Sequence, residues 1–256
     1  MIRTNIISTS GGLGSAITAL AAFERGYPFE LVFADTLIED EDLYRFLNDI
    51  ERVTGKTIHR LRSGLDPWDM FIERKYIGNT RLAHCSDELK TSEVMAWADM
   101  NTTPDSPIVL GMDWSELDRI ERAAARWAPR PVISMINDFQ VMRPTWRHLL
   151  AKYGIKIPRL YDMGFPHNNC GGFCVKAGLA QFATLLTRMP ERFRWHELRQ
   201  LDAMAKIGPT ARPFLRRTVR GVVEYLTLRR FRELYEAGEI DIDPYDFGAC
   251  GCFTEN

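Results

Sequence analysis

The stretch Ile6-Ile7-Ser8-Thr9-Ser10-Gly11-Gly12-Leu13-Gly14-Ser15-Ala16-Ile17-Thr18-Ala19-Leu20 decides the fold of this chain. A short apolar run ends in a turn rich in Ser and Gly, and an Ala/Leu-rich run with helical spacing follows it. This pattern predicts a strand, a glycine loop and a helix. The glycines let the backbone approach an anion closely, and the N–H groups and dipole of the helix start favour negative charge. The residues expected to bind a phosphate here are Ser8, Ser10, Gly11, Gly12, Gly14 and Ser15.

The segments that follow alternate between helical and extended patterns. Residues 14–25 form the predicted first helix, 29–34 a buried strand, 39–53 an amphipathic helix and 57–61 a third strand. Further strands are expected at 107–111 and before Ile136. This order predicts an α/β fold with a doubly wound, mostly parallel sheet. Asp35 and Thr36 follow the second strand, where such sheets bind ligands, and are therefore expected beside the phosphate loop.

Composition sets limits on the class of protein. The chain has 256 residues, of which 45% are hydrophobic and 26% charged, as in a globular protein with a full core. We expect a nucleotide-binding domain over residues 1–180 and a helical extension with a cysteine-containing tail over 181–256. No signal peptide or membrane span is predicted, so a cytoplasmic location is expected. The net charge of −1 gives no overall attraction to nucleic acid.

Five cysteines lie in three places along the chain. Cys85 stands alone, Cys170 and Cys174 flank two glycines, and Cys250 and Cys252 lie near the end. An odd number argues against a disulfide framework and for metal or redox chemistry. Thiolates select zinc, copper(I) or iron–sulfur centres. The last four cysteines would suit tetrahedral zinc, whereas mobile tail cysteines would act as nucleophiles.

Charged residues supply two further candidate features. Arg119, after the strand at 107–111, suits a substrate phosphate or sulfate, although Glu116 and Arg119 could equally form a surface ion pair on a helix. Seven arginines lie between Arg212 and Arg232, with Glu224 as the only acidic residue among them. We expect a basic helix there, which either binds a nucleic-acid backbone or forms a solvated face.

Several of these motifs resemble those of a known superfamily. The Ser10-Gly11-Gly12-x-x-Ser15 loop resembles that of the PP-loop superfamily, which comprises ATP pyrophosphatases and sulfonucleotide reductases. The run 32–36, followed by an acidic helix with Tyr44-Arg45-Phe46, is similar to the second strand of the phosphoadenylyl-sulfate (PAPS) reductase branch. The Cys-Gly-Cys tail resembles that of a phage and bacterial subgroup. The chain departs from the pattern at Gly14, where many members carry Asp, and at Ser86, where cluster-containing reductases carry a second Cys.

The resemblance implies an adenine nucleotide alpha hydrolase-like fold and an enzyme that binds PAPS or ATP, with Mg²⁺ as a further candidate ion. It implies a 4Fe-4S cluster held by Cys85, Cys170, Cys174 and Cys250, with zinc as the alternative. The catalytic residues it implies are Lys90, Arg119, Cys250 and Cys252. A thiol reductant protein and a second copy of the chain are implied partners.

Two chemistries remain open within this resemblance. In the reductase reaction, a cysteine thiolate attacks the sulfate sulfur of a PAPS-type nucleotide and a second thiol releases sulfite. In the sulfurtransferase reaction, ATP adenylates a nucleic acid or small molecule, and sulfur then displaces AMP. A nucleotide- or redox-sensing module without catalysis is the third alternative.

Overall fold

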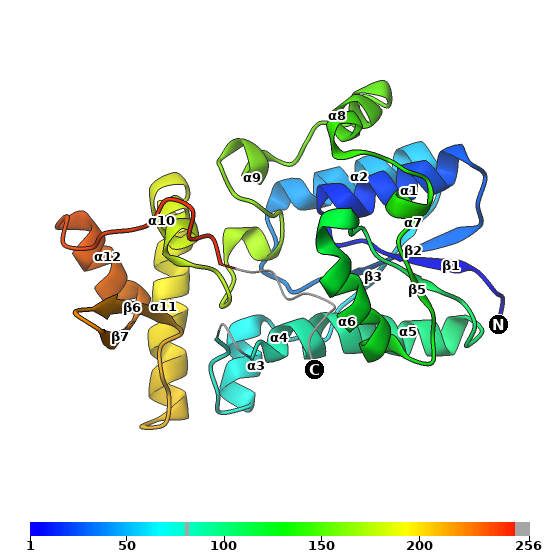
Figure 1. Cartoon of the computed structure of the whole chain (residues 1–256). Coiled ribbons are helices and arrows are strands. Elements are labelled where there is room, and N and C mark those ends of the chain that lie inside the picture. Colours follow the sequence, from blue (N-terminus) through cyan, green and yellow to red (C-terminus); the bar gives the residue numbers. More distant parts are fainter. Residues whose placement is uncertain (80–81, 249–256) are drawn as a thin grey trace.

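The computed structural model describes residues 1–79 and 82–248 (Figure 1). A five-stranded sheet of order β3-β2-β1-β4-β5 lies at its centre, and every neighbouring pair is parallel. The strands are β1 (Asn5–Ser8), β2 (Phe29–Ala34), β3 (Ile58–Leu61), β4 (Ile108–Val109) and β5 (Val132–Ile133). The strand order reverses its direction between β1 and β4, so the predicted doubly wound parallel sheet is confirmed.

Helices cover both faces of this sheet. One face packs against α1 (Leu13–Glu24), α2 (Glu41–Thr54), α7 (Met135–Asp138) and α8 (Arg143–Lys152). The other face packs against α5 (Ser92–Asn101) and α6 (Leu117–Trp127). Ile7 belongs to the first core and Ile6 to the second, as the alternation of side chains along a strand requires. The molecule is therefore a three-layer sandwich around the sheet (Figure 1).

A third core joins the C-terminal part of the chain to earlier segments. Its helices and strands are α3 (Pro67–Glu73), α10 (Leu179–Arg188), α11 (Pro190–Ile207), β6 (Leu215–Val219), β7 (Val222–Leu226) and α12 (Leu228–Glu236). Large aromatic side chains fill this core, among them Trp68, Phe173, Phe182 and Phe214. The helices expected after residue 181 are confirmed, and the domain boundary at residue 180 stays a prediction.

Short helical segments complete the described chain. They are α4 (His84–Ser86), the π-helical η1 (Asp87–Thr91), η2 (Trp114–Glu116), α9 (Arg159–Asp162) and η3 (Cys170–Gly172). No helix of the described residues is both long and apolar enough to cross a membrane.

The predicted basic helix between Arg212 and Arg232 is wrong. Most of this segment is the antiparallel hairpin β6–β7, and only its last residues begin α12. Arg220 and Gly221 form the turn, with φ of 51° and 81°. Two successive positive φ values characterise the tight turns that match the twist of a hairpin. The segment contains Thr218, Val219, Val222 and Val223, whose branched side chains favour strands over a helix.

Candidate functional site

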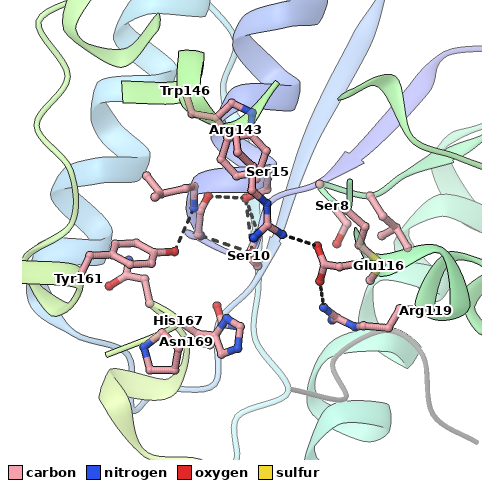
Figure 2. A pocket seen from close by; sticks show the side chains of 18 of the residues that line it. Ser8, Ser10, Ser15, Glu116, Arg119, Arg143, Trp146, Tyr161, His167 and Asn169 are labelled. Carbon is pink, nitrogen blue, oxygen red and sulfur yellow. Dashed lines mark hydrogen bonds and ion pairs between the residues drawn. The ribbon is translucent and has the colours of Figure 1, made fainter. Parts of the chain in front are cut away.

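A cavity of about 590 Å³ opens where β1 and β4 end and α1 begins (Figure 2). This is the edge at which the strand order reverses, where open α/β sheets bind ligands. Its lining comes from four parts of the chain: the loop after β1, the segment after β4, the start of α8 and the loop after α9. The polar and glycine residues among them are Ser8, Ser10, Gly12, Gly14, Ser15, Gly111, Glu116, Arg119, Arg143, Arg147, Tyr161, His167, Asn168 and Asn169.

The loop between β1 and α1 is held by its own hydroxyl groups. The Gly12 N–H donates to Ser10 Oγ at 3.3 Å, the Ser10 N–H donates to Ser15 Oγ at 3.2 Å, and the Ser15 hydroxyl donates to the Gly12 carbonyl at 3.0 Å. Gly11 has a φ of +74°, and a Cβ there would lie 2.6 Å from Leu43. The serines thus brace the loop around the cavity.

The N-terminus of α1 faces the cavity without any negative charge of its own. Gly12 is the N-cap and supplies no side chain, and the first turn contains no acidic residue. The Leu13 N–H donates to the Tyr161 hydroxyl at 3.2 Å. The helix dipole therefore favours an anion at this end of the cavity.

Gly14 lies where α1 closely approaches the segment after β4, and a side chain does not fit there. A Cβ on Gly14 would lie 2.1 Å from the Gly111 carbonyl oxygen, and a Cβ on Gly111 would lie 2.3 Å from the Ser15 nitrogen. Neither distance is sterically allowed. The close packing of Gly111 therefore excludes Asp at position 14, where many members of the superfamily carry it.

Arginines give the cavity a positive lining. Arg119, Arg143 and Arg147 line it, and among its described lining residues only Glu116 carries a carboxylate. Arg119 pairs with Glu116, so the predicted i, i+3 ion pair does form, and it forms inside the cavity wall (Figure 2).

The carboxylate of Asp113, which is not part of the cavity lining, positions Arg143. Arg143 donates to Asp113 and lies 3.6 Å from Glu116. Burial raises the pKa of Asp113, but hydrogen bonds from Arg143 and Ser115 outweigh it and leave that pKa below its usual value. Asp113 therefore stays charged and fixes Arg143 at the mouth of the loop.

Three buried polar atoms of the lining residues have no hydrogen-bond partner among the described residues. They are Ser8 Oγ, Arg119 Nε and Asn168 Oδ1. Ser8 is 3% exposed and Asn168 is 1% exposed. Leaving a buried polar atom unsatisfied costs about 1–3 kcal/mol, so such atoms are rare in folded proteins. Three of them in one cavity lining point to a polar ligand.

The wall opposite the loop comes from α9 and the segment that follows it. Tyr161 lies in the short helix α9, and His167 and Asn168 follow that helix. The Asn168 amide donates to the Gly11 carbonyl at 2.8 Å, which ties this wall to the phosphate loop. The Tyr, His and Asn residues before Cys170 are the local signal in the sequence for this wall.

Asp35 and Thr36 lie at the end of β2, as expected, and their observed contacts are to other protein groups. The Asp35 carboxylate accepts from the Tyr44 hydroxyl at 2.8 Å and from Arg62 Nε at 3.1 Å. Thr36 Oγ1 donates to the buried Glu39 at 2.9 Å. Neither residue lines the cavity, and their role in nucleotide binding stays a prediction.

Lys90 is buried beside a cysteine. Its Nζ lies 3.3 Å from Cys170 Sγ and 3.8 Å from Glu39 Oε1, and the Cys170 N–H donates to the same carboxyl group. Burial raises the pKa of Glu39, while the Lys90 charge acts in the opposite direction. Lys90 is absent from the described cavity lining, and its catalytic role stays a prediction.

The described part of the chain does not support the predicted cluster site. Over residues 1–79 and 82–248, no group of three or more His, Cys, Asp or Glu side chains is arranged to hold a metal ion. The ligand set Cys85, Cys170, Cys174 and Cys250 stays a prediction, and we assign no chemical step to a metal. Cys250 and Cys252 lie outside the described residues.

Comparisons with known proteins are sparse. No protein-family model matches the chain, and no curated protein sequence matches it. Among solved structures, it is similar to the crystal structure of phosphoadenylyl-sulfate (PAPS) reductase from Candida auris in a phosphate complex. That likeness covers 63% of this chain and 78% of the other at 15% identity, with a TM-score of 0.44. Similarity this low assigns neither family nor function, and the α/β fold rests on the observed strand order.

Proposed function

We propose that this protein is an enzyme that binds an adenine nucleotide in the cavity beside α1 and reduces a phosphoadenylyl-sulfate-type substrate with cysteine thiols. The observation that carries the proposal is the set of unpartnered atoms Ser8 Oγ, Arg119 Nε and Asn168 Oδ1 in a positively charged cavity. A volume of about 590 Å³ lies within the range of small-molecule sites. The choice of adenine and of sulfur chemistry rests on the resemblance of the loop, the second strand and the cysteine segments to PAPS reductases.

The proposed reaction has two balanced steps. A cysteine thiolate forms a sulfur–sulfur bond to the sulfate group as the bond from that sulfur to the nucleotide phosphate oxygen breaks, and the nucleotide leaves as an anion. A second thiol then attacks the cysteine sulfur, which forms a disulfide and releases sulfite. Cys250 and Cys252 are the proposed thiols, and an external dithiol, such as a thiol reductant protein, must reduce their disulfide. Arg119 and Arg143 are proposed to neutralise the phosphate and sulfate oxygens.

The first test is nucleotide binding by the full chain, measured by calorimetry with adenosine 3′,5′-bisphosphate, the product nucleotide. Replacing Ser8 by Ala removes a hydroxyl whose Oγ has no partner among the described residues. We expect affinity to fall about 5-fold, as for one lost hydrogen bond, while the stability of the free protein is unchanged or slightly higher.

Ser106→Ala is the matched control. Ser106 is equally buried, but its Oγ accepts from the Thr4 N–H at 3.2 Å and lies 3.1 Å from Thr103 Oγ1. This variant should lose stability and keep its nucleotide affinity. Equal affinity of wild type and Ser8→Ala would contradict the assignment of this cavity to the nucleotide.

Product analysis then separates the chemistries. Sulfite released from PAPS in the presence of dithiothreitol supports the reductase, and its loss in Cys252→Ser with unchanged nucleotide affinity supports the tail thiol as nucleophile. AMP and pyrophosphate formed from ATP would instead identify the sulfurtransferase. A nucleotide that binds and stays intact would identify a sensing module.

A further inference from the structure

A second cavity, of about 470 Å³, lies away from the sheet and beside the β6–β7 hairpin. Its described lining is Tyr76, Ile77, Asn79, Thr210, Arg212, Pro213, Phe214, Arg216 and Tyr225. Two of these residues are arginines and none of them is acidic. The chain as a whole carries a net charge of −1, so this cavity concentrates positive charge that the rest of the molecule offsets.

One face of the hairpin adjoins the cavity and is exposed to solvent. Arg216 pairs with Tyr225 across the two strands, and Thr218 pairs with Val223, so these four side chains lie on the same face. All four are exposed, and Tyr225 is 49% exposed. The opposite face carries Leu215 and Leu226, which are buried in the third core. The hairpin is thus anchored on one side and presents arginine, tyrosine and valine on the other.

The arginines of this segment fall into two groups. Those on or after β6 that face carboxylates form ion pairs: Arg217 with Glu224, Arg230 with Glu233, and both Arg229 and Arg232 with Glu197. Within the part of the chain that the structure describes, Arg212, Arg216 and Arg220 have no carboxylate within ion-pair distance. These three unpaired cations run from the cavity to the tip of the hairpin.

We propose that this cavity and the exposed hairpin face bind single-stranded nucleic acid. Arg216 and Arg220 are four residues apart, or about 13 Å along an extended strand, so the row of cations fits an extended chain of phosphates better than one nucleotide. Tyr76 and Tyr225, exposed by 38% and 49%, offer rings on which bases stack. Aromatic rings beside arginines favour a nucleic acid over an acidic peptide, because every base has a face to stack. This inference is independent of the proposed function.

The test is fluorescence anisotropy of the full chain with labelled single-stranded DNA and RNA at low salt. We expect the double variant Arg212→Gln/Arg216→Gln to bind at least 10-fold more weakly. Its plot of log affinity against log salt should have a slope smaller by about 1.4, because two phosphate contacts are lost. Tyr225→Leu keeps the strand and removes the ring, and we expect it to bind about 10-fold more weakly with an unchanged salt slope.

Matched controls come from elsewhere on the surface. Arg3→Gln/Arg52→Gln removes two exposed charges, and Tyr245→Leu removes a tyrosine that is 87% exposed. Both should bind the strand as wild type does. The proposal is overturned if wild type shows no binding, if the cavity variants stay within 2-fold of wild type, or if the controls lose as much affinity.

Two competition experiments test where the nucleic acid binds and which chemistry it has. Saturating adenosine 3′,5′-bisphosphate should leave nucleic-acid binding unchanged, and displacement would mean that the nucleic acid binds in the first cavity instead. A glutamate-rich peptide should compete only at much higher concentration than an unlabelled strand. Tighter competition by the peptide would make an acidic protein the partner and overturn the proposal.

Discussion

At the scale of the residue, Gly14 shows that the phosphate loop is shaped by its neighbour in the sheet. Alanine in the first turn of a helix is normally better than glycine by up to about 1 kcal/mol. At Gly14 the added Cβ would lie 2.1 Å from the Gly111 carbonyl oxygen, a backbone atom that cannot rotate away. Packing therefore outweighs helix propensity at this position.

We predict that Gly14→Ala destabilises the protein by about 3 kcal/mol, because α1 or β4 must shift to relieve the overlap. Urea unfolding followed by circular dichroism would measure it. Gly12→Ala is the control, since its Cβ would meet only the Ser10 and Tyr161 side chains at 3.3 and 3.4 Å. That variant should lose less than about 1 kcal/mol. Equal stability of the two variants would show that β4 moves freely relative to the loop.

Single residues also show which parts of the site a local sequence pattern predicts. The glycines and serines of the loop were predictable, because their pattern is local. Arg143 and Arg147 were not, because they reach the cavity only through the position of α8 beside β4 and the loop. Both residues lie on α8, which begins with an Arg-Pro pair, and nothing in this segment indicates a ligand. The contribution of an element to a site depends on long-range packing that a local pattern does not contain.

At the scale of the element, α12 docks on α11 through one buried carboxylate. The Glu197 side chain is 4% exposed and lies 2.8 Å from Arg232 Nε and 3.3 Å from Arg229 Nε. Burial raises the pKa of Glu197, but hydrogen bonds and charge from Arg232 and Arg229 outweigh it and lower that pKa overall. Arg229 and Arg232 therefore help to hold α12 against α11, although the sequence predicted that they belong to one basic surface with the other arginines.

We predict that Glu197→Gln lowers the free energy of unfolding by about 2 kcal/mol, because the variant keeps the shape and leaves the Arg232 charge without its buried partner. Chemical denaturation at neutral pH would measure the change. Glu233→Gln serves as the control, since Glu233 is 46% exposed and lies 3.7 Å from Arg230. An exposed pair of this kind contributes at most about 0.5 kcal/mol. Equal losses in both variants would contradict the docking role of Glu197.

At the scale of the whole molecule, the sheet was predictable and the third core was not. The alternation of strand and helix over the first sixty residues predicts a parallel sheet with few alternatives. The third core gathers Trp68, Phe173, His196 and Phe214, which are far apart in sequence and carry no common period. His196 lies at its centre: its ring stacks on Phe173 at 4.0 Å, and Trp68 Nε1 donates to its Nδ1 at 3.0 Å.

This arrangement makes the stability of the molecule depend on pH through His196. Its side chain is fully buried, and burial, together with the charges of Arg192 and Arg199, holds its pKa well below the usual value. His196 in the unfolded chain therefore binds a proton near pH 6.5, whereas His196 in the folded chain stays neutral. The free energy of unfolding falls as pH drops below about 6.5. Between pH 7.5 and 5.5 this group alone should remove on the order of 1 kcal/mol.

Carboxylates also titrate over this range, so the contribution of His196 must be isolated by substitution. His196→Gln keeps an acceptor for Trp68 and has no titrating group. It will be less stable than wild type at pH 7.5 because the ring contact with Phe173 is lost, but its loss of stability from pH 7.5 to 5.5 should be smaller by on the order of 1 kcal/mol. Urea denaturation of both proteins at the two pH values measures this difference. Equal pH dependence in wild type and variant would mean that His196 is protonated in the folded core, with a charge stabilised by a partner beyond Trp68 and Phe173.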